Sequence, residues 1–253
     1  MNQFQLKFKR AIVLNAMMVM LLSSSMIMAQ PIASNSAAKK PSATEQITMT
    51  KEKQQAITPQ QALQKLKDGN SRFVSGKPLK RNLQEETAIT AKGQYPYAAI
   101  LGCVDSRASA ELIFDAGLGD FFSARIAGNF VNTDILGSME FACKVAGAKM
   151  IVVMGHSKCG AIKGACDNVE LGNLTHLISE IKPSVESVKN IEGERNSKND
   201  TFVQAVAVEN VRLAIKEIQD KSPILAEMEK KGEIIIVGAM HDLDTGKVNF
   251  IQD

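Results

Sequence analysis

The sequence predicts an α/β fold in which a mostly parallel central sheet is flanked by helices. Short apolar runs rich in β-forming residues alternate with longer segments that repeat apolar residues at helical spacing. The runs are apolar throughout, as in strands buried on both faces. With 253 residues, 45% of them hydrophobic, the chain can form the core of one such domain and has little room for a second.

The predicted elements follow in chain order. An opening helix begins after Thr58, an N-cap with Gln61 three residues on, and ends near Gly76. Buried strands are predicted at 98–101, 121–126, 150–154 and 234–237. Helices are predicted at 133–145, 160–168, 171–181 and 202–219. A turn before Lys247 leads to a short last strand at 247–251, expected at the sheet edge and antiparallel to its neighbour.

The N-terminus predicts export. Lys7, Lys9 and Arg10 precede an apolar stretch at 11–22 and a region that ends at Ala29, which is the pattern of a signal peptide over residues 1–29. The alternative is an uncleaved membrane anchor, because this stretch approaches the ~20 residues that span a bilayer. We therefore expect a periplasmic or secreted protein, with membrane attachment only if the leader is retained.

Residues 30–52 are expected to be a flexible linker, because they are rich in Ser, Ala, Lys and Pro without apolar periodicity. Residues 53–253 then form the folded domain. Without the leader, the number of Lys and Arg residues falls from 30 to 27, which equals the 27 Asp and Glu residues. A domain near neutrality lacks the basic surface typical of nucleic-acid binding, so no such partner is expected.

Two clusters of chemically active residues stand where apolar strand runs stop. Cys103, Asp105 and Arg107 follow the first run, and His156 and Cys159 follow the third. The carboxyl ends of parallel strands meet at one edge of a sheet, where ligands bind at the point of reversed strand order. Two thiolates and an imidazole suit Zn²⁺. Three protein ligands also leave a fourth position open, as in catalytic rather than structural zinc sites.

Local features favour this interpretation. Cys159 precedes a predicted helix start at Gly160, where free N–H groups and the helix dipole favour a thiolate. Asp105 and Arg107 lie close enough in the chain for a bidentate ion pair. The alternative is that the two cysteines and the histidine are ordinary core residues, as isolated residues of these types usually are.

The other cysteines and histidines carry weaker signals. Cys143 and Cys166 have no partner at metal-site spacing and are expected to be buried free thiols, with a disulfide as the alternative in an oxidising compartment. His176 lies in a predicted helix, where a surface or packing role is favoured over a proton-shuttle role. His241 follows the fourth predicted strand and is expected to face a subunit interface.

A set of motifs along the chain resembles the β-class carbonic anhydrases. The motifs are Gln94-x-Pro96, Cys103-x-Asp105-Ser106-Arg107, Glu111-Leu112-Ile113-Phe114, Gly119-Asp120-x-Phe122, Arg125-x-Ala127-Gly128-Asn129, Ser138-x-Glu140 and Gly155-His156-Ser157-x-Cys159-Gly160. The match extends from Gly69-Asn70-x-Arg72-Phe73 to Asp242-x-Asp244-Thr245-Gly246. Each motif alone is weak, whereas the set is specific.

The resemblance implies the fold and the activity of that family. Residues 53–253 would be the catalytic domain of a zinc-dependent enzyme that hydrates CO₂ reversibly to bicarbonate and a proton. The implied ligands of one Zn²⁺ per chain are Cys103, His156 and Cys159. The implied assembly is a homodimer or a dimer of dimers, in which the opening helix reaches across to the partner.

The resemblance also implies roles for residues around the metal. Asp105 and Arg107 would form a catalytic dyad. An Asp105 freed from Arg107 could instead ligate the zinc, and the sequence leaves open which state holds. Gln94 and Gly160 are the implied substrate-binding residues, with Gln94 acting across a subunit interface.

The chain departs from the family pattern in two places, and two rival functions stay open. Ala108-Ser109-Ala110 stands where a Val-Pro-Pro-like run is common, but it includes no implied ligand. The chain has no Trp, around which some bacterial relatives build a regulatory bicarbonate pocket, so that pocket is expected to be absent. One rival is a hydrolase of CS₂ or COS with the same ligands. The other is a non-catalytic zinc protein, against which the Asp105 and Arg107 pair argues.

Overall fold

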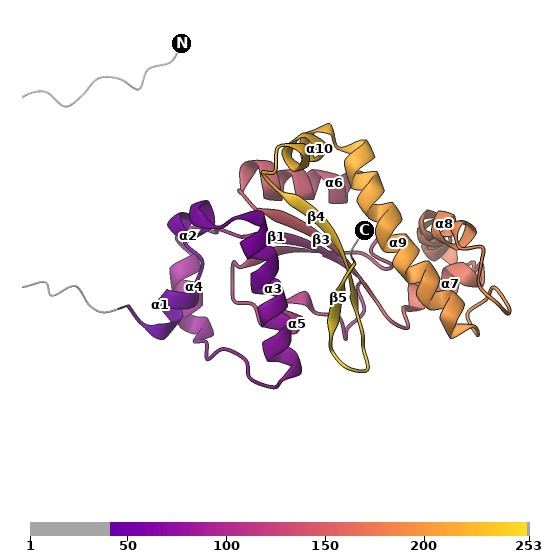
Figure 1. Ribbon diagram of the computed structural model, residues 1–253, viewed down its shortest axis with the longest axis horizontal. Helices are drawn as coiled ribbons and strands as arrows, with labels where there is room; N and C mark the ends of the chain where they lie inside the picture. Colours follow the sequence, from indigo (N-terminus) through magenta and orange to yellow (C-terminus); the bar gives the residue numbers. More distant parts are fainter. Residues whose placement is uncertain (1–40, 252–253) are drawn as a thin grey trace, which may run out of the picture. The chain divides into compact units, whose positions relative to one another are not determined.

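The computed structural model describes residues 41–251 and confirms the α/β class (Figure 1). Its five strands are β1 (Ala98–Gly102), β2 (Phe121–Arg125), β3 (Met150–His156), β4 (Ile235–His241) and β5 (Val248–Phe250). They form one sheet in the order β2-β1-β3-β4-β5. All neighbours are parallel except β5, which pairs antiparallel with β4 as predicted. The predicted signal peptide at 1–29 and the first part of the predicted linker lie outside the described residues.

The helices include the predicted ones and several shorter ones. They are α1 (Ala43–Ile47), α2 (Lys51–Ala56), α3 (Pro59–Val74), α4 (Leu83–Thr90), α5 (Ala110–Ile113), α6 (Thr133–Glu140), the π-helix η1 (Phe141–Val145), α7 (Gly160–Cys166), α8 (Gly172–Ser187), α9 (Asp200–Lys221) and α10 (Pro223–Lys230). The predicted helices correspond to α3, α6 with η1, α7, α8 and α9. In the part of the chain that the structure describes, no helix is both long and apolar enough to cross a membrane.

The end of the predicted linker at 30–52 is helical at 43–47 and 51–52, which corrects that expectation for these residues. Ser42 caps α1 in a capping box with Glu45, and Thr50 caps α2. Thr44 and Met49 are buried. Side-chain caps and a few buried contacts stabilise these two short helices, and neither feature produces the apolar periodicity that identifies a longer helix.

Both faces of the sheet are covered by helices, because successive residues of each central strand point to opposite sides. In β1, Ala99 and Leu101 belong to a core that packs under α6, η1 and α7–α10. Ala98 and Ile100 belong to a second core under α3 and α5. The central strands β1 and β3 are buried along their whole length, as their apolar sequences predict.

The strand order creates a switch point between β1 and β3. From β1 the chain passes to β2 on one side, and it then returns across β1 to β3 on the other. Gly102 at the end of β1 pairs with Met154 of β3, so the residues that follow reach the same sheet edge. This is the position at which open α/β sheets bind ligands.

The packing of α3 on α5 predicts the outcome of a glycine substitution. A Cβ on Gly69 of α3 would lie 2.0 Å from the backbone oxygen of Phe114, so the helices would have to separate. We expect Gly69→Ala to lower the free energy of unfolding by about 1–3 kcal/mol. Denaturant titration measures this change.

Gly137→Ala in α6 is the matched control. Gly137 is exposed, and its Cβ would meet no atom of the described residues within 4 Å. Alanine has the higher helix propensity, so the free energy of unfolding should rise by up to about 1 kcal/mol. An unchanged or raised stability of Gly69→Ala would contradict the packing of α3 on α5.

Candidate metal centre

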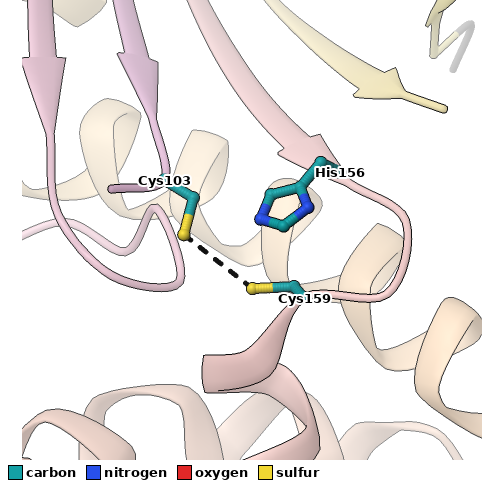
Figure 2. Close-up of side chains that lie close together, drawn as sticks. All are labelled: Cys103, His156 and Cys159. Atoms are coloured by element: carbon teal, nitrogen blue, oxygen red, sulfur yellow. Dashed lines mark hydrogen bonds between the residues drawn. The ribbon is translucent and has the colours of Figure 1, made fainter. Parts of the chain in front are cut away.

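Three buried side chains meet at the switch point. Cys103 follows β1 directly, His156 is the last residue of β3, and Cys159 is the N-cap of α7. Their exposed fractions are 4%, 1% and 1%. Figure 2 shows the two sulfurs and the imidazole ring turned toward a common point. Among residues 41–251 this is the cluster with the residue types and spacing of a metal site.

The distance between the two sulfurs suits a tetrahedral metal site. The three ligand atoms lie within 4.8 Å of one another. The sulfurs of Cys103 and Cys159 are 3.9 Å apart, close to the edge of about 3.8 Å that two Zn–S bonds of ~2.3 Å give in a tetrahedron.

The hydrogen bonding of the His156 imidazole is a second observation that suggests a metal site. Its Nδ1 lies 2.9 Å from the backbone oxygen of Ser157, which fixes the ring orientation. Its Nε2 is buried and has no hydrogen-bond partner among the described residues. A buried nitrogen without a partner is costly, and a metal ion would satisfy it.

The two thiols differ in acidity. The pKa of Cys103 is lowered, first because Cys159 can donate to its sulfur and also because the N–H of Gly128 donates to it. The pKa of Cys159 is raised, because it shares its proton with Cys103 and is desolvated. The N–H groups of Ala161 and Ile162 at the helix N-terminus lower the pKa of Cys159, as predicted, but the contact with Cys103 and the desolvation raise it more. One proton held between the two sulfurs relieves their repulsion, and a divalent cation in its place would stabilise both as thiolates.

Backbone and arginine contacts hold the loop that carries Cys103. The N–H of Gly128 donates to Cys103 Sγ at 3.4 Å. Arg125, at the end of β2, donates from Nε to the carbonyl of Cys103 at 2.9 Å and from Nη2 to the carbonyl of Asp105 at 2.6 Å. These contacts tie the ends of β1 and β2 together beside the cluster.

Asp105 and Arg107 form the predicted bidentate pair. Arg107 donates from Nε to Oδ1 of Asp105 at 3.0 Å and from Nη2 to Oδ2 at 2.8 Å, and its backbone N–H also donates to Oδ1. The hydrogen bonds from the guanidinium hold the pKa of Asp105 well below its usual range. Asp105 Oδ2 lies 3.9 Å from His156 Nε2, so the carboxylate borders the cluster while Arg107 binds it.

The two predicted substrate-binding residues lie in different places. Gly160 is the exposed first residue of α7, next to Cys159. Gln94 is exposed and precedes the amino end of β1, whereas the cluster lies at the carboxyl end of that strand. Within one chain, Gly160 therefore lies beside the cluster, whereas Gln94 lies at the opposite end of β1.

The fold places a further histidine beside the cluster, although the sequence pattern did not indicate that it belongs to the metal centre. His241, the last residue of β4, is buried and pairs in register with His156. Its Nδ1 has no partner among the described residues. Burial and the neighbouring His156 lower its pKa, which favours a neutral ring. Parallel pairing of β3 with β4 places the two histidines side by side.

The remaining predictions concern residues outside the cluster. Cys143 and Cys166 are buried free thiols, and no disulfide joins the cysteines of the described chain. Burial raises the pKa of Cys143 to about 12, so it stays protonated at neutral pH. His176 is exposed on α8, 4.0 Å from Glu180, which agrees with a surface role.

Comparisons with known proteins identify the family. The family model described as carbonic anhydrase matches residues 98–248. Carbonic anhydrase 2 of Mycobacterium tuberculosis is 37% identical over 197 residues, which are 75% of this chain and 91% of that protein.

Solved structures share the fold. The β-carbonic anhydrase CafA of Aspergillus fumigatus superposes with a TM-score of 0.57 at 26% identity, covering 76% of this chain and 89% of that one. One of two tetrameric β-carbonic anhydrases from Sordaria macrospora gives a TM-score of 0.57 at 25% identity, over 66% of this chain and 85% of that one. With the matched family model and the common fold, this chain belongs to the β-class carbonic anhydrase family.

Proposed function

We propose that this chain is a zinc-dependent carbonic anhydrase that hydrates CO₂ reversibly to bicarbonate and a proton. The observation that carries the proposal is a buried cluster of two sulfurs and one imidazole nitrogen with an arginine-held carboxylate at its border. Three ligands leave a fourth position open, as in catalytic zinc sites. The names of the matched relatives support the same reaction.

Cys103, His156 Nε2 and Cys159 would hold the ion. Zn²⁺ bound there would supply a Lewis acid that makes water nucleophilic near neutral pH. Asp105 is ionised and can only accept a hydrogen bond, so it would orient the attacking water. Arg107 would keep that carboxylate oriented and away from the ion.

The proposed assembly is a homodimer or a dimer of dimers. Gln94 lies at the sheet edge opposite the cluster of its own chain, so it could contact substrate only in a neighbouring subunit. The edge strand β2 is only partly buried, and Leu112 and Phe141 expose large apolar side chains. Uncovered edges and apolar side chains favour association. The matched β-carbonic anhydrases of Sordaria macrospora are tetrameric, which supports an oligomeric state for this chain.

The metal content of the purified protein tests the ligand set. The purified protein should contain about one zinc per chain, because the three ligands define one site. Cys159→Ala should abolish tight binding, since two ligands remain. Metal analysis after exhaustive dialysis measures both.

Cys166→Ala provides the control for that substitution. Cys166 is also a buried cysteine of α7 but lies outside the cluster. It should keep its zinc. Full zinc occupancy in Cys159→Ala would remove Cys159 from the ligand set.

Substitution of Arg107 tests the dyad. In Arg107→Ala, Asp105 loses its bidentate partner beside a Lewis acid and becomes free to ligate it. Zinc content should stay near the wild-type value, while kcat/KM for CO₂ falls by at least about 100-fold. Stopped-flow CO₂ hydration and a metal assay measure the two quantities.

Arg212→Ala is the control, because Arg212 forms an exposed ion pair with Glu209 on α9. It should leave both quantities unchanged. Near-normal hydration by folded, zinc-loaded Arg107→Ala would rule out the dyad. Parallel product analysis with COS and CS₂ tests the rival substrates.

Export is proposed from the charged and apolar pattern of residues 1–29. Expressed with its own N-terminus, the chain should appear as a shortened protein in the periplasm or the medium. Cell fractionation and N-terminal sequencing identify it. Recovery of the full-length chain in the membrane fraction would favour an N-terminal anchor instead.

A further inference from the structure

A buried series of hydrogen bonds leads from α8 and α9 to a ligand of the metal centre. Ser184 of α8 donates from Oγ to Asn210 Oδ1 at 3.2 Å. Asn210 of α9 donates from Nδ2 to the carbonyl of Gly128 at 2.7 Å. The N–H of Gly128 in turn donates to Cys103 Sγ at 3.4 Å. Figure 1 shows α8 and α9 packed side by side, where the first of these bonds forms.

The direction of each bond follows from the groups involved. A carbonyl oxygen can only accept, so the NH₂ group of Asn210 must face Gly128. The amide oxygen of Asn210 is then turned toward the hydroxyl of Ser184, which can donate. Ser184 and Asn210 have exposed fractions of 2% and 3%, so these bonds lie away from bulk water.

Gly128 needs an external contact to keep its orientation. Its φ of +77° lies in the left-handed region, and glycine has more backbone freedom than any other residue. A Cβ at this position would lie 2.4 Å from Cδ1 of Ile181, so a larger residue would displace that side chain in addition to straining the backbone. The hydrogen bond from Asn210 to its carbonyl therefore restrains the backbone of Gly128.

We infer that Asn210 is a positioning residue of the metal centre, which orients Gly128 so that its N–H donates to the sulfur of Cys103. Ser184 orients the Asn210 amide. This inference rests on the proposed zinc site. Hydrogen bonds to ligand atoms tune both metal affinity and ligand electronics, and their loss typically costs 10–100-fold in affinity.

An N–H donor also lowers the energy of the sulfur lone pairs, which a thiolate-to-metal charge-transfer band reports. The probe is Co²⁺, loaded into the full-length protein after removal of its native metal. In Asn210→Leu the charge-transfer band should move to longer wavelength, and the dissociation constant for Co²⁺ should rise about 10-fold. Absorption titration measures both in the folded protein.

Asn70→Leu is the matched control, because Asn70 is another buried asparagine whose amide bonds backbone groups. It donates to the carbonyls of Ile113 and Gly246 and accepts from the N–H of Val248, and none of these residues is a ligand. Its loss should lower stability while the band and the dissociation constant stay at wild-type values. A merely structural role of Asn210 would produce this same pattern.

Ser184→Ala keeps the test decisive if Asn210→Leu does not fold. Removing one hydroxyl should move the band in the same direction by a smaller amount. The inference would be overturned if folded Asn210→Leu kept the wild-type band and Co²⁺ affinity. If only Ser184→Ala folds, the same result in that variant would overturn it. Equal changes in Asn70→Leu would also overturn it. A wild-type protein that gives no thiolate-to-cobalt band would instead overturn the proposed metal site.

Discussion

The parallel pairing of β1 with β3 is the constraint on which the candidate centre depends. The two strands end at the same sheet edge, and this places Cys103 beside His156 although 52 residues separate them in the chain. Both strands are buried on two faces, so a slip of one residue would exchange the side chains of the two cores and is strongly disfavoured. Cys159 follows by a short loop. The register of one strand pair therefore brings all three side chains together.

Charge imposes the second constraint. Two thiolates and a carboxylate in a poorly solvated region would repel one another, and their burial would be costly unless positive groups and N–H donors compensated. Gly128 donates to Cys103, and Arg107 neutralises Asp105. Two thiolates would cancel the charge of a zinc ion, so the reactivity of such a centre depends on these surrounding donors more than in a site with three histidines.

Several element boundaries depend on contacts that periodicity does not reveal. The third strand continues two residues beyond the predicted end at 154, because Gly155 and His156 pair with Met240 and His241 of β4. The helix predicted to end at 181 runs to Ser187, through Pro183. A proline inside a helix is unfavourable by itself, and the packing of α8 against α9 compensates. The short helices α4, α5 and α10 have too few turns to show a periodic pattern.

The sequence by itself determined the fold class, the three candidate ligands and the adjacent Asp105 and Arg107. Each of these follows from local patterns: apolar runs mark the strands, and chemically distinctive residues stand directly after them. Only the tertiary structure decided that Arg107 holds Asp105 and that His241 lies beside His156. It also decided that Asn210 contacts Gly128, which lies 82 positions earlier in the chain. Such contacts depend on how strands and helices pack, and a single buried asparagine gives no periodic or motif signal in the chain.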